Sequence, residues 1–203
     1  MPSDEPVMMV PEKGDQPISE EMANIKKAIH SFQPSLKYPD DIFSLTAVME
    51  AYEGLISGNF GVGAVLVNKH SGKVLLKAHN SVFTPFFRSD MHAEMILLTE
   101  YENLMRGTSG EIYQDVILYT SLEPCPMCLT RILISGISEI NFIASDYIAG
   151  MVSASDRFPP IWQDLMIGKT IKNANCSPIL KELSFNIFNL TGQRLDKKLK
   201  KAQ

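Results

Sequence analysis

Two cysteines separated by two residues follow a short apolar run in the middle of the chain, in the sequence YTSLEPCPMCL at residues 119–129. The apolar run is typical of a strand that is buried on both faces. The residues after the cysteines predict a helix that ends at Gly136, and Pro126 suits its first position because no donor is needed there. Cys125 and Cys128, at positions i and i+3, should therefore lie on one face of the first helical turn, at the edge of a sheet.

A thiol pair at this position fits a thiol oxidoreductase as well as a metal site, because a helix N-terminus lowers the pKa of a thiol. A second motif, His92-Ala93-Glu94, opens the preceding predicted helix. Side chains from two neighbouring strand-to-helix junctions can meet in space. One imidazole and two thiolates make three protein ligands, whereas a structural zinc site would have four.

His92, Cys125 and Cys128 therefore predict a Zn²⁺ site whose fourth position is open to water. The helix dipole favours both thiolates. Glu94 points in a different direction from His92 on the same turn, so it is the candidate base that carries protons during catalysis. None of the other histidines, nor Cys176, is an obvious fourth ligand.

The composition is that of an ordinary globular protein with one sizeable core. Three cysteines among 203 residues are too few for a disulfide scaffold, which favours a reducing, cytoplasmic setting. The apolar run at Val7–Val10 is too short for a signal peptide or a membrane span, so we expect no membrane association. The net charge of −4 provides no overall basic field for nucleic acid.

The first residues are rich in Pro, Asp and Glu, and we predict a mobile N-terminal extension over residues 1–20 and a single domain over residues 21–203. Hydrophobic periodicity and turn residues then predict an alternation of elements along the chain. Helices are expected at 20–31, 41–56, 91–106, 125–136, within 155–166 and at 178–201, with a hairpin at 61–80 and strands at 115–121 and 137–145. This order indicates a single mixed sheet with helices on both faces.

The two motifs resemble the H-x-E and P-C-x-x-C signature of the zinc-dependent cytidine deaminase-like superfamily. Ser-Leu-Glu-Pro-Cys at 121–125 and Val-Gly-Ala-Val-Leu-Val at 62–67 are most similar to the branch that contains tRNA adenosine deaminases, guanine deaminases and fungal-type cytosine deaminases. The resemblance covers about residues 41–148.

The resemblance implies an α/β protein with three layers, α/β/α, around a central mixed five-stranded sheet. It implies a hydrolase that deaminates an amino-substituted nucleobase, free or in a nucleoside, with a tRNA adenosine as the alternative substrate, and commonly a homodimer. The implied roles are zinc ligands for His92, Cys125 and Cys128, proton transfer for Glu94, and substrate contacts for the Asn80 side chain and the Ala93 backbone amide. A thiol oxidoreductase that uses Cys125 and Cys128, or a zinc-binding pseudoenzyme, is the alternative.

Overall fold

Five strands form one mixed sheet in the order β2-β1-β3-β4-β5. The computed structural model describes residues 15–108, 113 and 115–201. Strand β1 pairs antiparallel with both β2 and β3, whereas β3, β4 and β5 run parallel. The strands are β1 (Gly63–Asn68), β2 (Val74–His79), β3 (Val116–Leu122), β4 (Glu139–Ala144) and β5 (Thr170–Asn173).

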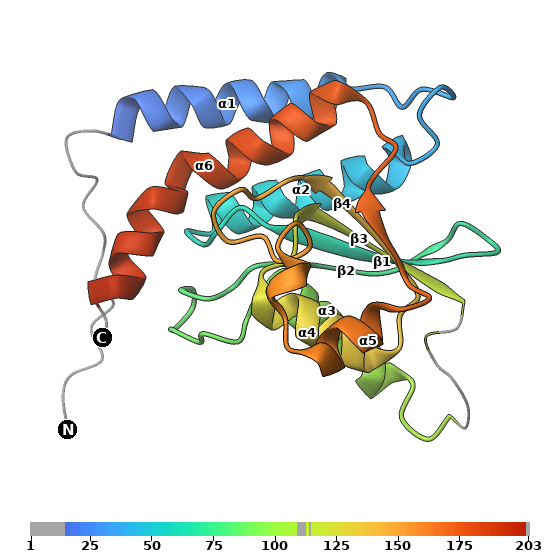
Figure 1. Ribbon diagram of the computed structural model, residues 1–203. Helices are drawn as coiled ribbons and strands as arrows, with labels where there is room; N and C mark the ends of the chain where they lie inside the picture. The colour runs from blue at the N-terminus through green and yellow to red at the C-terminus, as the bar shows by residue number, and fades with distance from the viewer. Residues whose placement is uncertain (1–14, 109–112, 114, 202–203) are drawn as a thin grey trace.

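Helices cover both faces of this sheet, which confirms the predicted fold class (Figure 1). Helices α2 and α6 pack on one face with α1 outside them, and α3, α4 and α5 lie on the other. The helices are α1 (Asp15–Ser31), α2 (Asp41–Ile56), α3 (Ala93–Leu104), α4 (Pro126–Ser135), α5 (Pro160–Met166) and α6 (Pro178–Lys201), with a 3₁₀ turn at Ser155–Arg157. Helix α4 ends at Gly136, whose φ of 89° is left-handed, as a helix C-terminus favours.

Strand β3 lies at the centre of the sheet and is buried on both faces, as its continuous apolar run predicts. Leu118 and Leu122 contribute to the core on the side of α3 and α4, and Tyr119 to the core on the side of α2 and α6. Because the side chains of a strand alternate, Thr120 points toward α3 with the two leucines. The sheet therefore places one polar side chain beneath the start of α3.

The start of the first helix and the presence of the last strand differ from the predictions made from periodicity. Helix α1 begins at Asp15, five residues before the predicted start of this helix, and residues 1–14 lie outside the described residues. Pro17 and the acidic residues that follow suit the first turns of a helix, which explains the earlier start. Strand β5 was not predicted from periodicity because its four residues at the sheet edge are too few to show a pattern.

The parallel strands β3 and β4 end at the same edge of the sheet, where Leu122 pairs with Ala144. In open α/β sheets this carboxyl edge is where ligands bind. The segment that follows β3 leads directly into the Cys125 motif. The fold therefore brings the predicted site to the expected edge.

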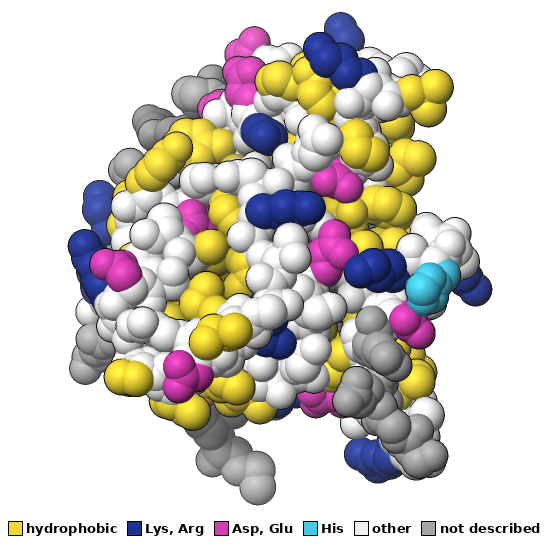
Figure 2. All heavy atoms as spheres, turned by 45° about the vertical axis from the view of Figure 1, so that its right-hand side comes forward, with side chains coloured by type: hydrophobic (Ala, Val, Ile, Leu, Met, Phe, Trp, Pro, Cys, Tyr) yellow, Lys and Arg dark blue, Asp and Glu magenta, His cyan; other side chains and the backbone are white. Residues whose placement is uncertain are grey.

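The surface mixes both signs of charge. On the face that Figure 2 shows, Lys and Arg side chains are scattered among Asp and Glu side chains and apolar patches. Among the described residues, no helix is long and apolar enough to cross a membrane.

Candidate metal centre

His92 is positioned by the start of helix α3. Its backbone is extended, with φ −74° and ψ 153°, and it is the last residue before the first helical turn. The carbonyl of His92 accepts the amide of Ile96 at 3.0 Å, which starts the ladder of helical hydrogen bonds. The imidazole therefore projects from a fixed helix end rather than from a free loop.

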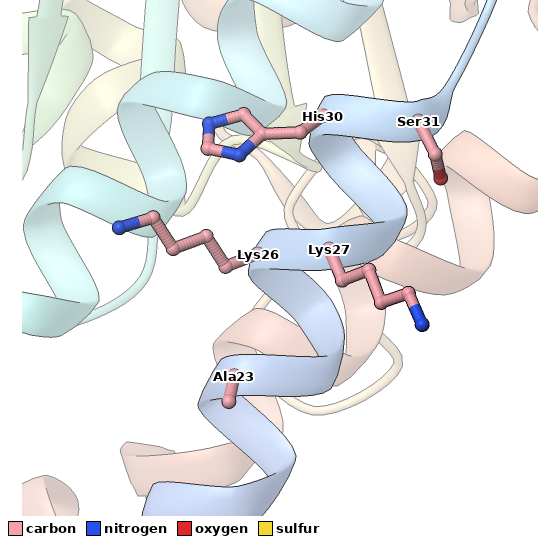
Figure 3. Close-up of a pocket in the computed structure, with 5 residues that line it drawn as sticks. All are labelled: Ala23, Lys26, Lys27, His30 and Ser31. Carbon is pink, nitrogen blue, oxygen red and sulfur yellow. The ribbon is translucent and has the colours of Figure 1, made fainter.

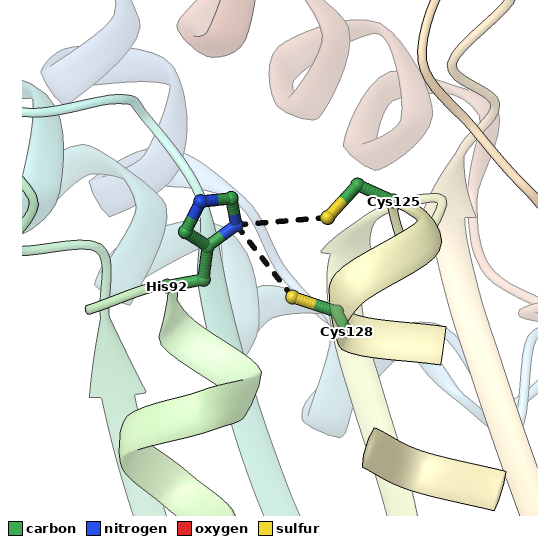
Figure 4. Close-up of side chains that lie close together, drawn as sticks. All are labelled: His92, Cys125 and Cys128. Carbon is green, nitrogen blue, oxygen red and sulfur yellow. Dashed lines mark hydrogen bonds between the residues drawn. The ribbon is translucent and has the colours of Figure 1, made fainter. Parts of the chain in front are cut away.

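Cys125 occupies the same position at the start of α4, and Pro126 is at the first helical position, as predicted. The carbonyl of Cys125 accepts the amide of Leu129 at 2.9 Å, so the first turn is closed. Cys128 is buried on that turn, and Cys125 is half-buried. Both sulfur atoms point toward the imidazole of His92 (Figure 4).

The three side chains have the spacing of a metal site. His92 Nδ1 lies 3.7 Å from Cys125 Sγ and 3.6 Å from Cys128 Sγ. A tetrahedral Zn²⁺ with bonds of about 2.0–2.1 Å to nitrogen and 2.3 Å to sulfur separates such ligand atoms by about 3.6 Å. All three ligand atoms lie within 4.8 Å of one another, the one group of this kind found in the described part of the chain. The donor set therefore fits zinc, and zinc is the cofactor.

The electrostatics of the cluster favour a thiolate at its outer sulfur. The hydrogen bond from Cys128 is the largest influence on the Cys125 thiol, and with the hydrogen bond and charge of His92 it outweighs burial and lowers the pKa of Cys125 to about 4. The same hydrogen bond to Cys125, together with burial, raises the pKa of Cys128. A bound metal cation would take the place of the thiol proton between the two cysteines and would bind both sulfur atoms.

Glu94 lies beside the cluster on the first turn of α3 and is only 3% exposed. Its Oε1 accepts a hydrogen bond from the Thr120 hydroxyl at 2.9 Å, and its Oε2 accepts one from the Cys128 thiol at 3.4 Å. Burial, followed by the charge of Cys125, raises the pKa of this carboxyl above its usual value. Glu94 is thus a buried acid next to the ligand atoms.

Asn80 and Ala93, the predicted substrate contacts, lie at the two ends of the loop between β2 and α3. A backbone hydrogen bond closes this loop. The amide of Ser81 donates to the carbonyl of Met91 at 2.9 Å, which joins the residue after Asn80 to the residue before His92. Asn80 is buried, and its Oδ1 accepts the amide of Val82 at 3.1 Å. The roles of Asn80 and Ala93 toward a substrate stay predictions.

Two residues near the site were not singled out from the sequence. Thr120 holds the Glu94 carboxyl, and a threonine inside the apolar run of β3 was the signal that could have identified it. Asn59 is buried, and its Oδ1 accepts the amides of Phe83 at 2.7 Å and Thr84 at 3.1 Å, so it holds the loop after Asn80. No local pattern marks Asn59, because its partners are 24 and 25 residues away.

The remaining histidines and Cys176 lie elsewhere, as predicted. His79 contacts Glu50 and His70 contacts Asp115, while Cys176 is buried between α2 and α6. A shallow pocket of about 480 Å³ lies on helix α1, away from the metal centre (Figure 3). It is lined by Ala23, Lys26, Lys27, His30 and Ser31 and includes no residue of the candidate site.

Comparisons with known proteins agree with this geometry. Residues 38–144 match the family model of the cytidine and deoxycytidylate deaminase zinc-binding region. The tRNA-specific adenosine deaminase of Bacillus subtilis is 33% identical over 107 residues, which are 53% of this chain and 63% of that protein, so the match spans less than two thirds of this relative. The guanine deaminase of the same organism is 32% identical over 119 residues, which are 58% of this chain and 72% of the relative.

A solved structure from a study of A-to-I editing by tRNA:A34 deaminases superimposes with a TM-score of 0.59 at 23% identity, over 72% of this chain and 98% of the other. This structural likeness supports the fold.

Proposed function

Since the chain belongs to the cytidine and deoxycytidylate deaminase zinc-binding family, we propose that it is a zinc-dependent hydrolase that removes the amino group of a nucleobase as ammonia. The observation that carries this proposal is the meeting of His92, Cys125 and Cys128 at zinc-binding spacing, with the buried acid Glu94 beside them. A structural zinc site would call for a fourth protein ligand, and none is found among the described residues.

Three residues hold the metal in this proposal. His92 binds through Nδ1, which leaves its Nε2 to carry the proton, and Cys125 and Cys128 bind as thiolates. Bound there, zinc would act as a Lewis acid that lowers the pKa of a water molecule to about 7, so that hydroxide is available at neutral pH.

Glu94 is the proposed proton carrier. It takes one proton from the attacking water and gives it to a ring nitrogen of the base. It then takes a second proton from the added hydroxyl group and gives it to the departing amine, which leaves as ammonia. The hydrogen bond from Thr120 holds one carboxyl oxygen, which keeps the side chain in a single orientation. Burial raises the pKa of this carboxyl, which favours its role as a proton acceptor.

Asn80 and Ala93 are the proposed contacts to the base. Asn80 Oδ1 is already used by the amide of Val82, which leaves the Nδ2 amide group to donate to an acceptor on the substrate. The amide of Ala93 is at the first position of α3, where backbone donors have no partner within the helix. Together they supply donors for the acceptor atoms of a base.

The substrate is a free base or nucleoside, or an adenosine within transfer RNA. The net charge of −4 favours a small, free substrate. The tRNA-specific adenosine deaminase among the relatives favours RNA, and the guanine deaminase favours a free base. An assay of both substrate classes decides between them.

The test is ammonia release by the zinc-loaded protein with guanine, cytosine, adenosine, cytidine and transfer RNA. We expect turnover of one of these substrates. Glu94→Gln should lower kcat by about 10²–10⁴-fold, because a positioned acid and base contributes that much, while one zinc per chain is retained. Glu100→Gln, an exposed acid on the same helix, is the matched control and should keep full activity.

Two results would contradict the proposal. Stoichiometric zinc without turnover of any substrate would indicate a zinc-binding pseudoenzyme. A reversible Cys125–Cys128 disulfide in a protein without zinc, with Glu94→Gln unchanged, would indicate a thiol oxidoreductase.

We extend the proposal to location and assembly. All three cysteines are free thiols, which suits a reducing, cytoplasmic setting. Ile134 on α4 and Ile161 on α5 are more than half exposed, and a homodimer would cover such side chains. Light scattering of the purified protein measures the mass, and a single-chain mass would exclude the dimer.

A further inference from the structure

Glu123 is a buried acid that the proposed chemistry does not use. It directly follows β3, lies two residues before Cys125, and is only 3% exposed. Its backbone amide continues the sheet by donating to the carbonyl of Ala144, at the end of β4, at 2.8 Å. Its side chain therefore starts from a fixed point at the carboxyl edge of the sheet.

The two carboxylate oxygens of Glu123 each accept a backbone amide from one segment of the chain. Oε2 accepts from Asp146 at 3.1 Å, and Oε1 accepts from Ser153 at 2.7 Å. The amide of Met151 also donates to the carbonyl of Pro124 at 2.9 Å. Residues 146–153, which we call the edge segment, are thus tied at three points to the two residues that precede Cys125.

Gly150 shows how closely the edge segment approaches this carboxylate. A Cβ atom at Gly150 would lie 2.5 Å from Glu123 Cδ and 2.5 Å from the carbonyl oxygen of Asp146. Such distances leave no space for any side chain. The segment is built around the Glu123 carboxylate, and a small residue is required where the two meet.

The remainder of the edge segment is also held by hydrogen bonds and packing, yet it exposes large side chains. Asp146 Oδ1 accepts the amides of Ile148 at 2.9 Å and Ala149 at 3.0 Å, which forms a tight turn. Met151 and Val152 pack against Leu129 and Leu133 on helix α4. In contrast, the side chains of the turn are in solvent.

Tyr147 and Ile148 on that turn are 88% and 96% exposed. They do not contribute to the core, and they stand at the carboxyl edge of the sheet, where α/β proteins bind ligands. A fixed turn that carries an aromatic and an aliphatic side chain there is suited to contact a flat, partly apolar ring system.

We propose that Glu123 is a positioning residue, whose carboxylate holds the edge segment in place beside the metal centre as a wall that binds the substrate. It acts through the segment and touches neither the metal nor the reacting atoms. This inference rests on the proposed deaminase function, and it assigns substrate affinity to a part of the chain outside the zinc ligands.

The test combines two variants with two measurements on the zinc-loaded full chain. Glu123→Gln leaves a single acceptor oxygen for the two backbone amides, of Asp146 and Ser153, that Glu123 binds. Gly150→Ala displaces the edge segment while Glu123 is intact. Each variant should raise the KM for the substrate that the wild type uses by about 10-fold, whether that is guanine, cytosine, adenosine, cytidine or transfer RNA. The kcat should stay within twofold, and each chain should still bind one zinc ion. Amide hydrogen exchange in residues 145–154 should become at least 10-fold faster.

Glu102→Gln is the matched control. Glu102 also accepts hydrogen bonds from two side chains, Tyr113 and Arg131, but lies between α3 and α4 away from the edge segment. It should change neither the KM nor exchange in residues 145–154. Glu123→Asp, which keeps both oxygens on a shorter side chain, should give an intermediate KM.

Unchanged exchange in Glu123→Gln would overturn the proposal. Loss of zinc and of kcat, with KM unchanged, would also overturn it, because Glu123 would then support Cys125 instead. If the wild type deaminates none of the substrates, the proposed function fails, and the exchange measurement alone decides whether Glu123 holds the segment.

Discussion

Single side chains show how this protein accommodates acids in its interior. Glu50, Glu94 and Glu123 are all buried, and each carboxylate accepts hydrogen bonds from donors on other elements. A buried carboxylate without such donors would be strongly destabilising. The partners differ in kind, since Glu50 has the Lys77 ammonium group and the His79 imidazole, Glu94 a hydroxyl and a thiol, and Glu123 backbone amides. The environment thus gives the same residue type three different roles.

Glu50 provides a pH-dependent contribution to stability. Its hydrogen bond with His79 is the largest influence on the carboxyl, and with Lys77 it outweighs burial and lowers the pKa below its ordinary value. A lowered pKa in the folded state stabilises the fold above the unfolded pKa, and this stabilisation is lost as the pH falls through the folded pKa. Glu50→Gln should therefore lower the free energy of unfolding at pH 7 by about 2 kcal/mol, and by less as the pH falls through the folded pKa of Glu50.

Urea titrations at pH 7 and pH 3 measure this difference. Glu53→Gln, an exposed acid one turn further along α2, is the control and should change the free energy of unfolding little at either pH. If Glu50→Gln lowered the free energy of unfolding equally at both pH values, the charge of Glu50 would not contribute to stability.

Whole elements are positioned by close backbone contacts. Strand β1 approaches helix α2 at Gly63, where a Cβ atom would lie 2.3 Å from the carbonyl oxygen of Ala47 and 2.4 Å from the amide nitrogen of Ala51. Backbone atoms of a helix cannot move aside as a side chain can. The glycine therefore sets the distance between the helix layer and the sheet.

Gly63→Ala should destabilise the protein by about 3 kcal/mol, because the new methyl group overpacks a rigid contact. Gly192→Ala in helix α6 is the matched control, since the nearest atoms to its Cβ, in Phe188, lie at 3.8 Å. It should stabilise the protein by up to about 1 kcal/mol, because glycine is a poor helix former. The urea midpoints of both variants test these two predictions. Equal changes in stability would contradict them.

At the scale of the whole molecule, the hydrophobic cores of the described chain do not include the three candidate metal ligands. One large core lies on each face of the sheet, and a smaller one lies between α4 and α5. The ligands stand on the ends of two helices that these cores already hold. The fold should therefore persist without zinc, unlike a zinc finger, which unfolds when its metal is removed.

Chelation of zinc should lower the melting temperature by about 5–10 °C, as expected when a ligand at about 100 times its Kd is removed from a protein of this size. The far-UV circular dichroism at 25 °C should not change. Cys125→Ala should melt at the temperature of the chelated wild type and should not respond to the chelator. Loss of helical signal on chelation would show that the metal is required for folding.

Local chemistry explains which features of this chain were predictable. The cysteine pair, Pro126 and Gly136 mark the start and end of α4 within a few residues of sequence, and the apolar run of β3 shows burial on both faces. These signals depend on helix ends, strand periodicity and ligand chemistry, all of which act between near neighbours. The fold class and the candidate zinc ligands followed from such signals together with the resemblance to a known family.

Contacts between distant residues required the folded chain. The bonds of Thr120 to Glu94, of Asn59 to the loop after Asn80, and of Glu123 to the edge segment join residues between 23 and 30 positions apart. No periodicity or motif encodes these pairs, because their formation depends on how strands, helices and loops from different parts of the chain pack together. The amino-acid order thus specified the chemistry of the metal centre, and three-dimensional packing selected the side chains that hold its surroundings in place.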